Sequence, residues 1–162
     1  MTDFTPRPRL YFASDHAGFA LKQALMEYAS TLGCAIEDMG PFTLDPEDDY
    51  PDFVTPLAEK VAAEEGARGV VIGASGQGEA MCANRVHGVR AAVYYGEPTH
   101  PQTDASGHTL GMIESERAHN DANVLSIGAR FVLGEQARDA LKLFLDTPFS
   151  GEERHARRIG KF

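Results

Sequence analysis

Short apolar runs alternate along the chain with stretches in which apolar residues recur every three or four positions. The apolar runs, which predict buried strands, are residues 10–13, 34–39, 69–72, 89–95 and 124–127. The intervening stretches have the periodicity of amphipathic helices, which we expect at 19–32, 51–65, about 78–85, 134–146 and 152–161. Strands that alternate with helices in this way favour a parallel sheet. The sequence therefore predicts a single α/β domain over residues 1–162 with a five-stranded parallel sheet.

Two segments stand apart from this alternation. Residues 96–115 contain Pro98, Pro101, Gly107 and Gly111 and are predicted to form a long loop. Loops of this length are uncommon in compact domains and often serve a function. The other segment, residues 152–162, is predicted to be a basic C-terminal helix.

The overall charge narrows the classes of partner. The chain has 15 Lys and Arg against 24 Asp and Glu, a net charge of −9, which argues against nucleic acid and anionic membranes. No apolar run approaches the roughly 18 residues of a membrane span. Its first ten residues lack the apolar run of a secretory signal, and Cys34 and Cys82 do not make a disulfide scaffold. We therefore expect a cytoplasmic protein.

The charge is unevenly distributed. Residues 154–162 carry four basic side chains and no acid, a local charge of +4 that leaves −13 on the first 153 residues. At the other extreme, five acids crowd eight residues without a base: Asp45, Glu47, Asp48, Asp49 and Asp52. A basic segment on an acidic body indicates either a local anion site or a solvated tail, and this observation alone leaves both open.

Ligands of parallel α/β sheets bind at the carboxyl ends of the strands. After the first predicted strand, Asp15 and His16 stand where an acid and an imidazole can reach one ligand. The alternative is that Asp15 caps the following helix and that His16 is an ordinary surface residue.

After the third predicted strand, residues 73–79 read GASGQGE. Three glycines leave backbone N–H groups unobstructed at a helix start, which can cradle an anion or oxyanion. The segment matches neither nucleotide motif, GxxxxGK[ST] or GxGxxG. Ser75 and Glu79 lie one helical turn apart and share a face, an arrangement suited to proton abstraction beside a carbonyl. The alternative is a tight turn with Glu79 as an ordinary acid of a first helical turn.

Two further groups lie near the end of the chain. His119 can transfer a proton near neutral pH and Asn120 can hold a hydroxyl, although ordinary turn chemistry explains this segment equally well. Arg154 and Arg158 lie one turn apart on the last predicted helix and can clamp a phosphate. The chain has no HExxH or CxxC spacing, so we expect no metal.

In this order, these segments resemble the ribose-5-phosphate isomerase B family, which includes the galactose-6-phosphate isomerase subunits. The matches are SDHAG at 14–18, DYP at 49–51, GxSGxGE at 73–79, ANR at 83–85, HNDANVLSIGAR at 119–130 and RHxxR at 154–158. The resemblance implies a Rossmann-like three-layer sandwich. It also implies a homodimer, or a dimer of dimers, with active sites shared between subunits, and aldose–ketose isomerisation of a phosphosugar without a cofactor.

The family uses as its base either a cysteine at the end of the third strand or a glutamate after the glycine turn. Gly73 stands here at the cysteine position, so the chain resembles the glutamate variant, with Glu79 as the base. By this resemblance, Glu79 would move the proton between C1 and C2 through a cis-enediolate, and Ser75 would assist. The enediolate oxygen would be held by the N–H groups of three residues, Gly76, Gln77 and Gly78.

The resemblance also assigns the binding groups. Asp15, His16 and Asn120 would hold sugar hydroxyls, and His119 would open the furanose ring. Arg154 and Arg158 would clamp the phosphate, with at least one from the neighbouring subunit and with Arg130 as a further contributor.

The implied reaction is the interconversion of ribose 5-phosphate and ribulose 5-phosphate. Residues 96–115 are longer than in compact members, so an isomerase of a tetrose or hexose phosphate is an alternative, as is a non-catalytic phosphosugar-binding protein. A base needs a pKa near the working pH; burial would raise the pKa of Glu79 and a helix N-terminus would lower it, and the sequence leaves this balance open.

Overall fold

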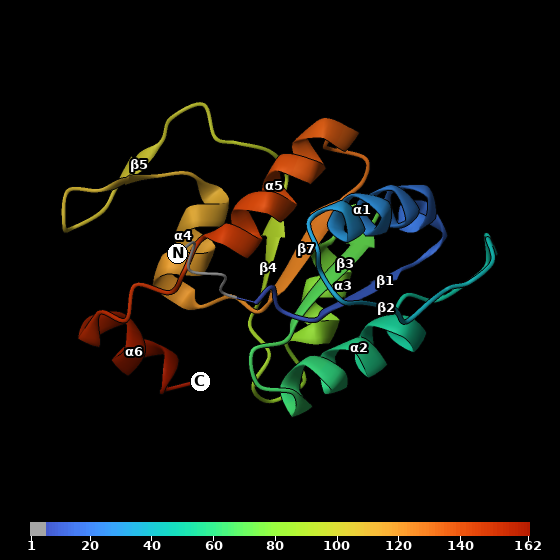
Figure 1. The fold of residues 1–162 in the computed structure, drawn as a ribbon, viewed down its shortest axis with the longest axis horizontal. Coiled ribbons are helices and arrows are strands. Elements are labelled where there is room, and N and C mark those ends of the chain that lie inside the picture. Colours follow the sequence, from blue (N-terminus) through green and yellow to red (C-terminus); the bar gives the residue numbers. More distant parts are fainter. Residues whose placement is uncertain (1–5) are drawn as a thin grey trace.

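The computed structural model describes residues 6–162. The first five residues, on which the predicted absence of a secretory signal partly rests, lie outside the described part. A five-stranded parallel sheet runs through the centre in the order β2-β1-β3-β7-β4 (Figure 1). Its strands are β1 (Leu10–Ser14), β2 (Ile36–Asp38), β3 (Arg68–Gly73), β4 (Ala91–Tyr94) and β7 (Val124–Gly128). The predicted parallel sheet is confirmed, with strands two and four shorter than the predicted runs.

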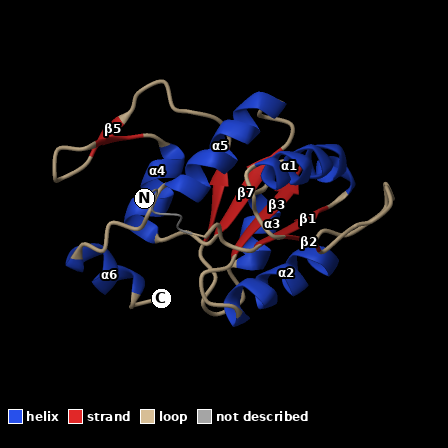
Figure 2. Cartoon of the chain, in the orientation of Figure 1, coloured by secondary structure: helices blue, strands red, loops and turns tan. Residues whose placement is uncertain are grey.

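Residues 6–162 form six α-helices around the sheet (Figure 2). They are α1 (Phe19–Thr31), α2 (Pro51–Ala63), α3 (Gln77–Ala83), α4 (Met112–Asn120), α5 (Gly134–Asp146) and α6 (Glu153–Ile159). A short 3-10 helix, His16–Gly18, precedes α1. In the part of the chain that the structure describes, no helix has the length and apolar character needed to cross a membrane.

Alternating side chains of the strands build two cores. Leu10 and Phe12 of β1 face a core completed by α1, α4 and α5, whereas Tyr11 and Ala13 face a second core completed by α2 and α3. All four side chains are buried. A sheet buried on both faces between two helical layers is the predicted three-layer sandwich.

The segment predicted as a long loop, 96–115, is more ordered than expected. It contains a two-stranded antiparallel hairpin, β5 (Gln102–Thr103) and β6 (Thr109–Leu110), and the first turn of α4. The helix escaped prediction because its buried residues are Ile113, Glu116 and Arg117, of which only one is apolar. Its start is also unusual, since Glu114 accepts the Gly111 N–H at 2.8 Å without a Ser, Thr, Asp or Asn cap.

Candidate active site

The predicted base lies in a glycine-lined recess at the carboxyl end of β3. Glu79 belongs to the first turn of α3 and is only 3% exposed. A Cβ atom on Gly73, the last residue of β3, would lie 1.8 Å from Glu79 Oε1 and 2.2 Å from Cδ. The Glu79 carboxyl therefore occupies the space that any side chain at position 73 would need. A side chain at position 73 would therefore displace the Glu79 carboxyl from this position.

The balance of effects on Glu79 favours the protonated form. Burial raises the pKa of Glu79, its own backbone N–H lowers it, and the charge of Asp15 raises it further; the net shift is upward. Burial thus outweighs the helix N-terminus, which decides the question that the sequence left open. A raised pKa makes the Glu79 carboxylate a stronger base than an exposed glutamate.

The glycine turn depends on close approach between α3 and β7. Gly76 caps α3 with φ +72, a conformation that favours glycine. A Cβ there would lie 2.9 Å from Ser126 Oγ, and that hydroxyl donates to the Gly76 carbonyl at 2.6 Å. Ser75 Oγ accepts the Gln77 N–H at 3.3 Å. The Ser75 hydroxyl therefore lies next to the N–H of Gln77, one of the three predicted oxyanion donors.

Asp15 and His16 also lie at the carboxyl ends of the strands, directly after β1. Asp15 is buried and its Oδ1 accepts the N–H groups of Ala17 and Gly18 at 2.9 and 3.2 Å, which is the capping geometry weighed as an alternative. In the β1–β3 pair Ser14 lies opposite Ile72, so Asp15 follows β1 at the same level as Gly73, the residue that contacts the base. Capping and a place beside the base are therefore compatible.

His16 is held by an acid that the sequence did not connect to it. His16 Nδ1 donates to Asp48 Oδ1 at 2.7 Å, and its backbone N–H reaches the same atom at 2.9 Å. This hydrogen bond raises the pKa of His16, whereas the charge of Arg130 lowers it. The signal for this contact in the sequence is the acid-rich segment 45–52, which contains Asp48.

Arg130 and Tyr50 complete this edge. The Arg130 N–H donates to the Ala74 carbonyl at 3.1 Å, which sets residue 130 against the glycine turn. Tyr50 belongs to the DYP segment and was not predicted as a site residue, yet a Cβ on Gly78 would lie 2.5 Å from its hydroxyl oxygen. The phenol therefore lies directly over the turn. The structure brings together the predicted residues Asp15, His16, Ser75, Gly76, Gln77, Gly78, Glu79 and Arg130.

The remaining predicted residues lie toward the amino ends of the strands, opposite the Glu79 recess. Asn120 ends α4 immediately before β7 begins, and its carbonyl accepts Arg90 Nε at 3.2 Å, at the amino end of β4. At about 3.3 Å per strand residue, the length of β7 separates the amino ends of the strands from their carboxyl ends by roughly 15 Å. Within one chain, His119 and Asn120 are therefore not brought together with Glu79.

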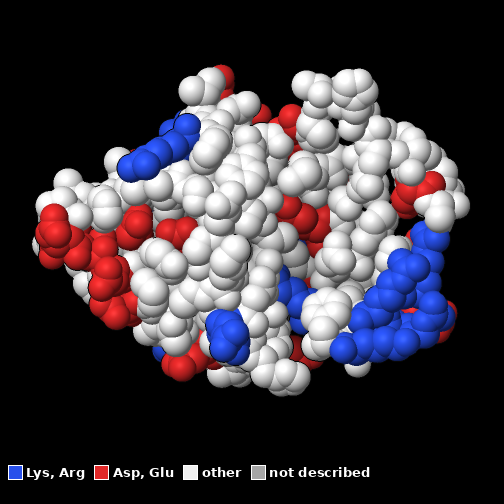
Figure 3. Space-filling model, turned by 180° about the vertical axis from the view of Figure 1, so that it is seen from behind, with Lys and Arg blue, Asp and Glu red and all other residues white. Residues whose placement is uncertain are grey.

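His119, Arg154 and Arg158 belong to a cluster formed by α4, α6 and the hairpin. The His119 ring stacks on His155 with centroids 4.3 Å apart, and its Nε2 lies 3.1 Å from Asp104 Oδ2. Arg154 donates to Ser106 Oγ at 2.8 Å, and Arg158 is exposed one turn later on α6. Basic side chains gather at the α6 end of the molecule and acidic ones at the opposite end (Figure 3).

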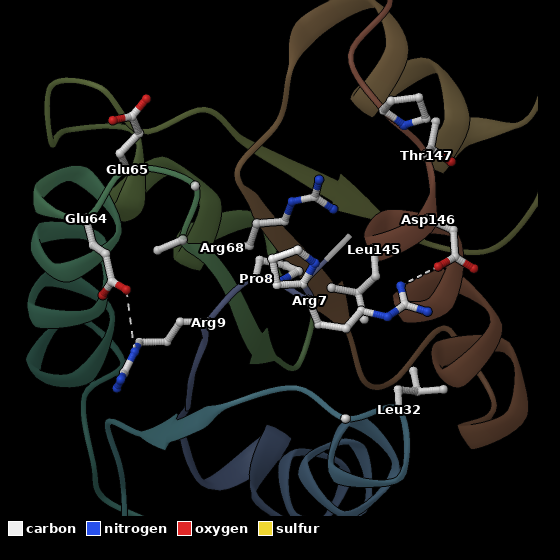
Figure 4. A pocket seen from close by; sticks show the side chains of 15 residues that line it. Arg7, Pro8, Arg9, Leu32, Glu64, Glu65, Arg68, Leu145, Asp146 and Thr147 are labelled. Atoms are coloured by element: carbon white, nitrogen blue, oxygen red, sulfur yellow. Dashed lines mark hydrogen bonds and ion pairs between the residues drawn. The ribbon is translucent and has the colours of Figure 1, made fainter. Parts of the chain in front are cut away.

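A pocket of about 870 Å³ lies at the amino ends of β1 and β3 (Figure 4). It is lined by three arginines, of which Arg7 pairs with Asp146 and Arg9 lies 3.5 Å from Glu64. None of the predicted site residues lines it. The candidate active site is therefore the recess around Glu79 rather than this pocket.

Known proteins are similar to this chain along nearly its whole length. The pattern of the Ribose/Galactose Isomerase family matches residues 10–162. The ribose-5-phosphate isomerase B of Mycolicibacterium paratuberculosis is 36% identical over 151 residues, 93% of this chain and 87% of that protein.

Two solved structures are similar along nearly the whole chain. The ribose-5-phosphate isomerase B of Mycoplasma genitalium, crystallised with bound ribulose-5-phosphate, is 36% identical with a TM-score of 0.83 and covers 94% of this chain and 92% of its own. The type B ribose 5-phosphate isomerase of Trypanosoma cruzi is 39% identical with a TM-score of 0.81, covering 96% and 94%.

Proposed function

This chain belongs to the Ribose/Galactose Isomerase family, and we propose that it catalyses the reversible isomerisation of ribose 5-phosphate to ribulose 5-phosphate. The observation that carries this proposal is the buried Glu79 carboxyl, with its raised pKa, beside the glycine turn. The ribulose-5-phosphate bound to the Mycoplasma genitalium relative supports the substrate class.

The proposed reaction starts from the open-chain aldose. Glu79 takes the proton from C2, the electron pair of that bond forms the C1–C2 double bond, and the carbonyl pair moves to O1. The N–H groups of Gly76, Gln77 and Gly78 stabilise the negative oxygen. Ser75 moves the O2 proton to O1, C2=O forms, and Glu79 returns its proton to C1. Every step uses protein groups and no cofactor.

We propose that each site is shared between two copies of the chain. One copy contributes the Glu79 recess at the carboxyl ends of the strands. The second contributes the residues of α4 and α6, which lie away from that recess in the same chain: His119, Asn120, Arg154 and Arg158. Exposed apolar side chains near the recess support this arrangement, because a second copy would cover Met81 and Phe131, which are 71% and 60% exposed. The charge separation in Figure 3 supports it as well.

Ring opening precedes isomerisation in this scheme. His119 takes the proton of the anomeric O1 hydroxyl, the C1–O4 bond breaks as C1=O1 forms, and the same proton is returned to O4. Arg154 and Arg158 hold the phosphate, and Arg130 adds to the positive charge. Asp15, His16 and Asn120 hold the hydroxyls.

We place the enzyme in the cytoplasm. Cys34 and Cys82 are both free thiols, which suits a reducing compartment.

The experiment that tests the function is a panel of four-, five- and six-carbon phosphosugars assayed with the wild type and Glu79→Gln. We expect the highest kcat/KM with ribose 5-phosphate and a loss of about a thousand-fold in kcat for Glu79→Gln. The matched control, Glu65→Gln, removes an exposed acid outside the recess and should retain full activity.

Robust turnover by Glu79→Gln would show that Glu79 is not the base. A preference for a four- or six-carbon sugar would replace the substrate, and binding without turnover of any sugar would favour a phosphosugar-binding protein.

A further inference from the structure

The hairpin β5–β6 lies along α4 in a defined register. Gln102 Nε2 donates to Ser115 Oγ at 2.7 Å, and two residues later Asp104 Oδ2 lies 3.1 Å from His119 Nε2. Two strand residues span about 6.6 Å, and four helical residues span about 6 Å. The matching distances let the hairpin contact α4 at both points, so the turn of the hairpin sits beside His119.

The Asp104 carboxylate is fixed by the turn that it belongs to. Its Oδ1 accepts the N–H groups of Ser106 and His108 at 2.8 and 2.9 Å, and the Asp104 N–H donates to the His108 carbonyl at 2.8 Å. These backbone hydrogen bonds, foremost that from His108, hold the pKa of Asp104 at about 2. Oδ1 therefore serves the turn, and the ionised carboxylate presents Oδ2 to the imidazole.

His119 is held on a second side by α6. His155 stacks on its ring with planes 13° apart, and burial lowers the pKa of His155 so that the neutral ring faces His119. With Nε2 of His119 donating to Asp104, its other nitrogen, Nδ1, has no hydrogen-bond partner in residues 6–162. The ring is thus fixed at one edge and one face, and a single nitrogen remains to meet a substrate.

We propose that Asp104 is a positioning residue that holds His119 in the tautomer protonated on Nε2, with the lone pair of Nδ1 directed to the sugar. The proposal rests on the proposed function, in which Nδ1 takes the O1 proton as the ring opens and returns it to O4. A carboxylate in this position orients the imidazole and stabilises the charge that it gains, as in other acid–histidine pairs. The hairpin also reaches the phosphate clamp through the contact of Ser106 with Arg154.

The test compares Asp104→Asn and Asp104→Glu with the wild type on ribose 5-phosphate. Asparagine keeps an oxygen for the turn but presents an amide to Nε2, so we expect kcat to fall at least about ten-fold while KM changes less than about two-fold. Asp104→Glu keeps a carboxylate and should retain more of kcat than Asp104→Asn. Thr109→Ala is the matched control, because it removes a hydroxyl of the same hairpin whose hydrogen bond within residues 6–162 is to Thr103. It should keep the wild-type kcat.

Long-range proton–nitrogen NMR of the histidine rings provides a readout that a purely structural role would not move. The His119 signals, assigned with His119→Asn, should show a proton on Nε2 in the wild type and lose that preference in Asp104→Asn. A kcat of Asp104→Asn within two-fold of the wild type would overturn the proposal, as would an unchanged His119 tautomer. If Glu79→Gln is inactive while Asp104→Asn is fully active, only this inference fails. A wild type that isomerises no phosphosugar overturns both.

Discussion

The position of a single carboxyl depends on the absence of a side chain six residues earlier. Glu79 packs onto Gly73 so closely that even a methyl group there would overlap Oε1. The recess also removes water from the carboxyl, and this burial is the main cause of its raised pKa. The geometry and the acidity of the proposed base thus have the same origin.

Replacing Gly73 tests this relation. In Gly73→Ala we expect the Glu79 carboxyl to move, with a loss of about 100-fold in kcat and about 1–3 kcal/mol in the free energy of unfolding. Gly134→Ala is the control, since a Cβ there meets no atom within 4 Å. Steady-state kinetics and urea unfolding measure both effects. Wild-type kcat in Gly73→Ala would show that the recess does not position Glu79.

The acidity of Glu79 can be measured directly. Because burial favours the protonated form, the carboxyl should titrate above the ordinary value of 4.5, and kcat should fall as the pH drops through that raised pKa. Carbon NMR of labelled glutamate, with Glu79→Gln to assign the signal, reports the titration. A midpoint at or below 4.5 would contradict burial as the dominant effect.

At the level of secondary structure, α4 and its hairpin are the elements that the sequence pattern described least well. The strands and α1, α2 and α5 could be predicted because their buried positions are apolar and regularly spaced. On α4, Glu116 and Arg117 are buried instead, so hydrophobic periodicity gives no signal. The hairpin strands have two residues each and are mostly exposed, which leaves no alternation to detect.

The buried acid of α4 makes folding sensitive to pH. Burial raises the pKa of Glu116 to about 8, and its Oε2 has no hydrogen-bond partner in residues 6–162. A raised pKa means that the folded state binds the proton more tightly than the unfolded state. Its contribution to stability is therefore complete below about pH 4.5 and is lost as the pH rises through about 8.

Glu116→Gln should remove this dependence. We expect the variant to gain about 3 kcal/mol of unfolding free energy relative to the wild type between pH 5 and pH 8. Urea unfolding at several pH values measures the difference, with the exposed Glu65→Gln as control. A stability difference between Glu116→Gln and the wild type that does not change with pH would show that Glu116 does not titrate in this range.

At the level of the whole molecule, the site predicted from the sequence divides into two halves. The order of the motifs predicts which residues form the site, but their spacing does not show that Glu79 lies at the carboxyl ends of the strands and His119 toward their amino ends. That separation follows from α4, an unpredicted helix that packs against β4 and α5 and ends before the start of β7. The basic C-terminal segment likewise lies at one end of the molecule, away from its acidic end (Figure 3).

The central claim is that an active site takes Glu79 from one copy and His119 from another. Its most direct test is to unfold, mix and refold equal amounts of Glu79→Gln and His119→Ala, each inactive alone, and to assay ribose 5-phosphate. Random pairing makes half of the dimers mixed, and each mixed dimer has one intact site, so about a quarter of the wild-type activity should return. A mixture that stays as inactive as its two components would contradict the claim.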